Sequence, residues 1–89
     1  MNNSHILVGI RDLKANLIRG PYILRTEAEF IRAIQDEAKN PQSDLYKHPN
    51  DFRLEVYSEW DENHGLLNAD IGDFKSLGIV YDLINVSQN

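Results

Sequence analysis

The chain has 89 residues and a mass of 10.3 kDa, which allows a single domain, residues 1–89, with one hydrophobic core. Hydrophobic residues make up 42% and charged residues 26%, values that exclude a disordered chain. The absence of cysteine excludes a disulfide framework, a thiolate zinc site and a cysteine nucleophile. No apolar run approaches the roughly 18 residues of a membrane span, and the amino terminus lacks signal-peptide features. We therefore expect a cytoplasmic protein with no membrane partner.

The charge is unevenly distributed along the chain. Nine basic residues stand against 14 acidic ones, a net charge of -5. Residues 1–25 nevertheless carry four basic groups and one acidic group, whereas residues 54–89 carry seven acidic groups and one basic group. Such a chain can present a basic surface to a polyanion while repelling it elsewhere. Charges that only solvate the surface are the simpler alternative, and the sequence leaves both open.

The first quarter of the chain predicts two strands. Residues 5–10 are apolar and rich in β-branched side chains, which indicates a strand buried on at least one face. Residues 12–20 fit either a helical turn or a connecting loop, and they end at a Gly20-Pro21 break. Residues 22–24 then predict a second, short strand, because proline is tolerated at the start of a strand.

The next segment predicts one amphipathic helix at about residues 27–39. Thr26 can accept from a backbone N–H of the first turn while Glu29 reaches back to the N–H of the cap, forming a capping box. One helical face is apolar and consists of Phe30, Ile31, Ile34 and Ala38. Asn40-Pro41 ends the helix.

The remaining elements are less uniform. Two prolines argue against a helix in residues 41–51, which we expect to be an ordered loop. Residues 52–60 alternate as in a half-buried antiparallel strand, and 61–65 are turn residues leading to a partner strand at 66–69. From Asp70 onwards the apolar side chains predict one short helix or strand that completes the core.

Together these elements predict an α+β fold: a small, mainly antiparallel sheet of three to four strands packed against one principal amphipathic helix. The side chains expected to face the helix from the alternating strand are Phe52, Leu54, Val56 and Trp60. A small chain with two sheet edges and an apolar tail has surface to hide, so we also expect a homodimer.

Catalytic and metal-binding patterns are weak. The three histidines, His5, His48 and His64, are scattered and lack the spacing of a metal centre. Residues 61–65 resemble a calcium loop only at its start, since the later ligands are missing. The sequence contains no nucleophile elbow and no glycine-rich phosphate loop. We expect no enzymatic activity, no metal and no cofactor.

Two groups of residues could bind nucleic acid. The first is a basic run interrupted by a tyrosine, and the second is an aromatic, a cation and a histidine in the expected loop. Arginine can hold phosphates and tyrosine can stack on an unpaired base, so single-stranded DNA is the indicated ligand. The alternative for the second group is that Tyr46 fills the core while Lys47 faces water. The candidate residues are Arg11, Lys14, Arg19, Tyr22, Arg25, Tyr46, Lys47 and His48.

The stretch Asp44-Leu45-Tyr46-Lys47-His48-Pro49-Asn50-Asp51-Phe52, followed by Trp60-Asp61 and the Gly65 turn, carries a family resemblance. It resembles the small nonstructural protein of gokushovirus-type microviruses, which are single-stranded DNA phages. The resemblance covers about residues 6–67 and is most specific at Lys47-His48-Pro49.

The resemblance implies a nonstructural accessory protein in the host bacterial cytoplasm. It would act in genome replication or in the switch to single-strand synthesis and packaging, through weak, sequence-independent binding to single-stranded DNA. The alternative is a non-enzymatic adaptor that engages the phage replication initiator, the procapsid or a host replication factor through a sheet edge or the apolar tail.

Overall fold

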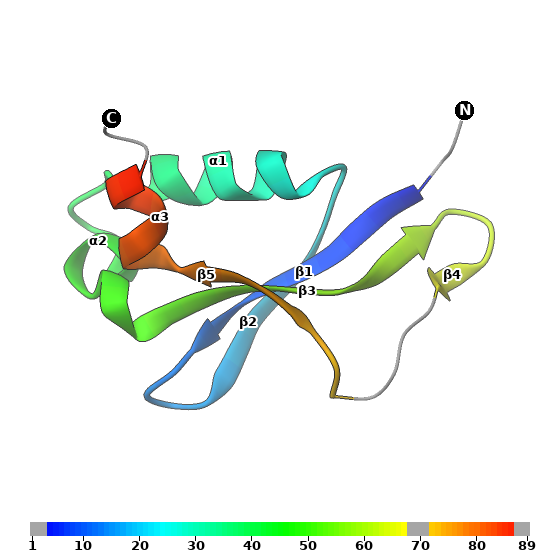
Figure 1. Ribbon diagram of the computed structural model, residues 1–89, viewed down its shortest axis with the longest axis horizontal. Helices are drawn as coiled ribbons and strands as arrows, with labels where there is room; N and C mark the ends of the chain where they lie inside the picture. The colour runs from blue at the N-terminus through cyan, green and yellow to red at the C-terminus, as the bar shows by residue number, and fades with distance from the viewer. Residues whose placement is uncertain (1–3, 68–71, 87–89) are drawn as a thin grey trace.

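The computed structural model describes residues 4–67 and 72–86. The chain forms an α+β domain, as predicted, although the sheet has five strands (Figure 1). The elements in chain order are β1 (Ser4–Asp12), β2 (Leu17–Leu24), α1 (Glu27–Glu37), α2 (Asp44–Lys47), the 3-10 turn η1 (Pro49–Asp51), β3 (Phe52–Asp61), β4 (Gly65–Leu67), β5 (Lys75–Ile79) and α3 (Val80–Val86).

All strand pairs are antiparallel, and the sheet order is β2-β1-β3-β4, with β5 also paired to β3. The ambiguous residues 12–20 form a hairpin: a turn at residues 13–16 joins β1 to β2, and Asn16 takes a φ of 56° there. The second strand is therefore longer than predicted. It passes through Gly20 and Pro21 because the β1–β2 register shifts at that point, and an edge-strand irregularity tolerates proline.

The hydrophobic core lies on one face of the sheet, beneath the helices. Figure 1 shows α1 along that face, with α3 beside the C-terminal end of α1. Phe52 and Leu54 of β3 are buried against Phe30 and Ile34 of α1, as predicted. The buried core residues are Val8, Ile10, Phe30, Ile34, Ala38, Leu45, Phe52, Leu54 and Val80.

The prediction that Trp60 joins this core was wrong. The β1–β3 register shifts so that Leu7 pairs with Ser58 but Val8 pairs with Val56, which leaves Tyr57 as an extra residue. An inserted residue reverses the alternation beyond it. Trp60 therefore pairs with His5, on the face opposite Val8.

The helix α1 begins as predicted and ends at Glu37, two residues early. Thr26 accepts a hydrogen bond from the backbone N–H of Glu29 at 3.0 Å. The Glu29 carboxylate accepts from the backbone N–H of Arg25 at 2.9 Å, one residue before the expected donor. These two hydrogen bonds fix the start of the helix. They differ from a standard capping box in that Glu29 accepts from the residue before the N-cap.

The expected loop at residues 41–51 contains two short helical segments, α2 and η1, which corrects that prediction. Ser43 caps α2 by accepting from the Leu45 N–H, and Pro49 occupies the first position of η1, where a missing N–H costs nothing. Leu45 fills the core while Tyr46 is exposed, so the alternative in which Tyr46 fills the core is also wrong.

The end of the chain supplies both of the elements that the sequence offered as alternatives, β5 and α3. The partner strand after the turn is β4, and the remainder of the predicted strand 66–69 lies outside the described residues. Gly65, in the predicted turn, takes a positive φ of 81°. Among residues 4–67 and 72–86, none of the helices has the length and apolar character needed to cross a bilayer.

Candidate functional site

The face of the sheet opposite α1 carries a charged cluster built on β1 and β3. Val8 and Leu54 point into the core, so alternation places Gly9, Arg11 and the neighbours of Leu54 on the other face. Arg11 lies directly across from Arg53 in the β1–β3 register. Two like charges in that position repel each other unless a third group neutralises one of them.

Glu55 is that third group, and its side chain is completely buried. Its Oε2 atom accepts from Arg11 Nε at 2.9 Å and from Arg53 at 2.9 Å for Nε and 2.8 Å for Nη2. Its Oε1 atom accepts from the Tyr57 hydroxyl at 2.9 Å. We call Arg11, Arg53, Glu55 and Tyr57 the arginine cluster. Two guanidinium groups and one carboxylate give it a formal charge of +1.

Electrostatics hold the cluster in this charge state. Burial alone raises the pKa of Glu55, but the hydrogen bonds from Arg11, Arg53 and Tyr57 outweigh it and leave that pKa below its ordinary value. Burial, followed by the hydrogen bond to Glu55, raises the pKa of the Tyr57 phenol well above its ordinary value. Glu55 is therefore ionised and Tyr57 neutral at physiological pH.

Gly9 makes room for this arrangement. A Cβ atom added to Gly9 would lie 2.7 Å from the Tyr57 hydroxyl oxygen and 2.8 Å from Cγ2 of Ile18. Both distances are shorter than van der Waals contact. The bare backbone at Gly9 is what lets the Tyr57 ring lie across β1 and reach Glu55.

An aromatic ring adjoins the arginine cluster. The Cζ atom of Arg53 lies 4.8 Å from the centroid of the Phe74 ring, and that of Arg11 lies 5.8 Å away. These are cation–π distances. The Phe74 side chain is still 40% exposed, so an apolar surface is available beside the guanidinium groups.

The predicted basic run has a different environment. Arg19 Nη2 lies 3.1 Å from an Asp44 carboxylate oxygen and 4.0 Å from one of Asp12. Lys14 Nζ lies 3.5 Å from Asp51. Two cations therefore meet three carboxylates, and a phosphate placed there would be repelled.

These five residues and His48 line one shallow cavity of about 250 Å³, so the structure brings the expected loop next to the basic hairpin. It does not gather all eight candidates on one surface. Arg11 lies in the arginine cluster, Tyr22 lines a separate groove, and Tyr46 is exposed on α2. Within the described residues, the side chains of Arg25 and Lys47 form no ion pair, and no group of side chains is arranged to hold a metal ion.

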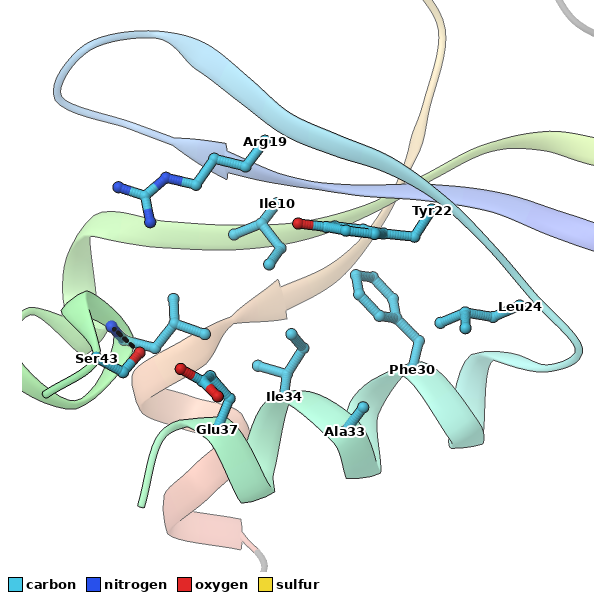
Figure 2. A pocket seen from close by; sticks show the side chains of 10 residues that line it. Ile10, Arg19, Tyr22, Leu24, Phe30, Ala33, Ile34, Glu37 and Ser43 are labelled. Carbon is cyan, nitrogen blue, oxygen red and sulfur yellow. Dashed lines mark hydrogen bonds between the residues drawn. The ribbon is translucent and has the colours of Figure 1, made fainter. Parts of the chain in front are cut away.

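The groove lies between β2 and α1 and has a volume of about 400 Å³. Figure 2 shows Tyr22 and Leu24 of β2 on one side of it and Phe30 and Ile34 of α1 on the other. Arg19 and Glu37 stand at its polar end. The groove adjoins the edge strand β2, whose side chains are mostly exposed.

The sequence patterns do not single out four residues of this site: Arg53, Glu55, Tyr57 and Phe74. A partial signal was present, because alternation along β3 puts Arg53, Glu55 and Tyr57 on the same face. The register that brings Arg11 opposite Arg53 and the approach of Phe74 depend on tertiary pairing, which no local pattern encodes.

Fold and site define a small α+β domain whose sheet is covered by helices on one face and carries an arginine–carboxylate cluster on the other. A protein-family model described as "Phage ORF5 protein" matches residues 5–78, which begin within β1 and end within β5. The chain belongs to this phage protein family. Comparison with curated proteins and with solved structures finds no match.

Proposed function

We propose that this phage protein is a nonstructural accessory protein of a single-stranded DNA microvirus. In this proposal it acts in genome replication or in the switch to single-strand synthesis and packaging, by weak, sequence-independent binding to single-stranded DNA. Membership of the phage family supports the viral setting. The DNA-binding part of the proposal rests on the chemistry of the uncovered sheet face.

The observation that carries the proposal is the pair of arginines sharing one buried carboxylate. Glu55 fixes both guanidinium groups but cancels only one of their charges, so the arginine cluster keeps a charge of +1. Guanidinium groups held in place lose little side-chain entropy when they bind a phosphate. The half-exposed Phe74 ring beside them offers a stacking surface for an unpaired base.

Weak binding follows from the rest of the molecule. The chain as a whole has a net charge of -5, which repels a polyanion at low salt. Two phosphate contacts also contribute only a small counterion-release term. The base stacks on an aromatic face that every base can use, so little sequence preference is expected.

A salt titration of DNA binding tests this proposal. Fluorescence anisotropy of a labelled unpaired oligonucleotide measures affinity at several salt concentrations, with a duplex of the same sequence in parallel. Each phosphate contact on a single strand contributes about 0.7 to the negative slope of log affinity against log salt. Arg53→Gln should reduce that slope by about 0.7, because it removes one contact.

Arg32→Gln is the matched control, since it removes the same charge from the exposed face of α1. It should leave the slope unchanged. Absence of measurable binding by the wild type, or the same slope for both variants, would contradict the proposal.

A protein-interaction adaptor is the second candidate, and the apolar groove between β2 and α1 favours it. An adaptor would bind the phage replication initiator, the procapsid or a host replication factor through apolar contacts. Such binding depends weakly on salt, so the same titration separates the two functions.

A further inference from the structure

We infer that β2 is the interface of a symmetric homodimer, in which the β2 strands of two copies pair antiparallel to form one continuous sheet. This inference does not depend on DNA binding. β2 lies at one end of the sheet, and among the described residues it pairs only with β1. At the opposite side of the sheet, the short strands β4 and β5 both pair with β3.

β2 lacks the charges that protect many edge strands. Natural edges avoid pairing with other chains by carrying charges, above all lysine, or by a proline or a bulge. β2 has a proline and a bulge, but both are confined to Gly20-Pro21 in the middle of the strand, which leaves the residues on either side free to pair. The only charged residue of β2 is Arg19, and its guanidinium group is held by Asp44 and lies 4.8 Å from the centre of the Phe52 ring. Its charge is therefore directed inwards, away from the edge. β2 carries no carboxylate, so two copies meet there without acidic repulsion.

The side chains of β2 expose apolar surface on both faces. Leu17 is 66% exposed and Ile23 47%, and Ile18 and Tyr22 are exposed to a similar extent as Ile23. A standard interface buries about 800 Å² on each partner, and these four side chains supply roughly half of that. A stable dimer would therefore also have to bury the backbone of β2 and the rim of the groove.

The face that each side chain occupies selects one register. The β1–β2 register shift at Gly20-Pro21 puts Leu17, Tyr22 and Leu24 on the helix side, and Ile18 and Ile23 on the uncovered side. A two-fold axis between Gly20 and Pro21 pairs Leu17 with Leu24 of the second copy and Ile18 with Ile23 of the second copy. It pairs β2 on both sides of the Gly20-Pro21 bulge and matches apolar side chains on both faces. Shifting the strands by one residue would put helix-side residues opposite residues of the uncovered side.

This register also closes the groove. The sheet of the second copy continues past β2 beneath the open side of the groove, where Tyr22 and Leu24 already form one wall (Figure 2). The helices of both copies then lie on one face of the joined sheet. The two arginine clusters lie together on the other face.

Sedimentation equilibrium at micromolar concentration tests the dimer. The expected mass is twice the chain mass of 10.3 kDa. Ile23→Lys should weaken the dimer at least tenfold, because the two-fold axis places two lysines in the interface. Leu66→Lys is the matched control, an equally exposed apolar residue on β4, and it should leave the dimer within twofold of wild type. Circular dichroism checks that both variants are folded.

Disulfide trapping tests the register, since the chain has no cysteine of its own. Oxidation of an equimolar mixture of Ile18→Cys and Ile23→Cys proteins should give a covalent dimer, because antiparallel partners lie within disulfide range. Each variant alone should stay uncrosslinked, since its own cysteines would be roughly 15 Å apart along the strands. A monomeric wild type, equal effects of the two lysine variants, or crosslinking of single variants without the mixture would overturn the inference. If the protein is monomeric, the groove remains accessible to a partner protein, as the adaptor function requires.

Discussion

The substitution Glu55→Ala should strongly destabilise the fold. Glu55 is fully buried and accepts hydrogen bonds from Arg11, Arg53 and Tyr57. Removing it leaves the Tyr57 hydroxyl without its acceptor and two facing guanidinium groups without a counter-charge. Breaking a buried ion pair in this way costs about 3–5 kcal/mol.

The lower end of that range applies here, because the guanidinium groups are partly solvated: the side chain of Arg11 is 19% exposed and that of Arg53 28%. We therefore expect a loss of about 3 kcal/mol in the free energy of unfolding. For a domain of this size, each kcal/mol shifts the melting temperature by about 4–8 °C. Urea denaturation followed by circular dichroism measures the change. A loss below about 1 kcal/mol, the net value of an ordinary hydrogen bond, would refute the reasoning.

The pH dependence isolates the charge of Glu55. Its folded-state pKa is lowered from the ordinary value of 4.5, so its ionised form stabilises the fold above that pH, and the stabilisation is lost as the pH falls through the folded-state pKa. Wild type should exceed Glu55→Gln in stability at neutral pH, and the difference should narrow below about pH 4.5. A difference that stays constant from pH 7 to pH 3 would show that the charge does not matter.

Two further substitutions test the packing of the two faces. Ile34→Ala should cost about 2–5 kcal/mol in urea denaturation, because Ile34 is buried in the core between α1 and the sheet, and an unchanged midpoint would contradict that packing. Gly9→Ala should cost about 1–3 kcal/mol, because the new methyl group collides with the Tyr57 ring. An unperturbed near-ultraviolet spectrum of the tyrosines in that variant would argue against the collision.

Local patterns predicted the elements that local chemistry controls. The Thr26 cap, the apolar face of α1 and the alternation of β3 up to Val56 all depend on residues close in sequence, and the structure confirms them. The turn at residues 61–65 was identified for the same reason, since Gly65 supplies a conformation that other residues adopt at a cost.

The rest of the site depends on pairing between distant residues. A single inserted residue at Tyr57 moved Trp60 to the other face, and nothing in the local alternation reveals such a bulge. The sequence identified the cations of the basic run. It did not predict their ion pairs with Asp44 and Asp51, because these carboxylates belong to a different segment of the chain. The burial of Glu55 between two arginines was not predicted, because it depends on the β1–β3 register that brings Arg11 next to Arg53.

The proposed function requires that the arginine cluster contacts single-stranded DNA, and a comparison of two charge-matched variants tests this contact. Glu55→Gln keeps the shape of the side chain and raises the charge of the arginine cluster from +1 to +2, whereas Glu59→Gln removes one negative charge from an exposed position on the same strand.

Both variants therefore have the same net charge. The measurement is the anisotropy affinity for an unpaired oligonucleotide at low salt and low temperature, with both proteins shown to be folded. We expect Glu55→Gln to bind more tightly than Glu59→Gln, with a slope of log affinity against log salt at least as steep. Equal affinity of the two variants, or weaker binding by Glu55→Gln, would contradict it.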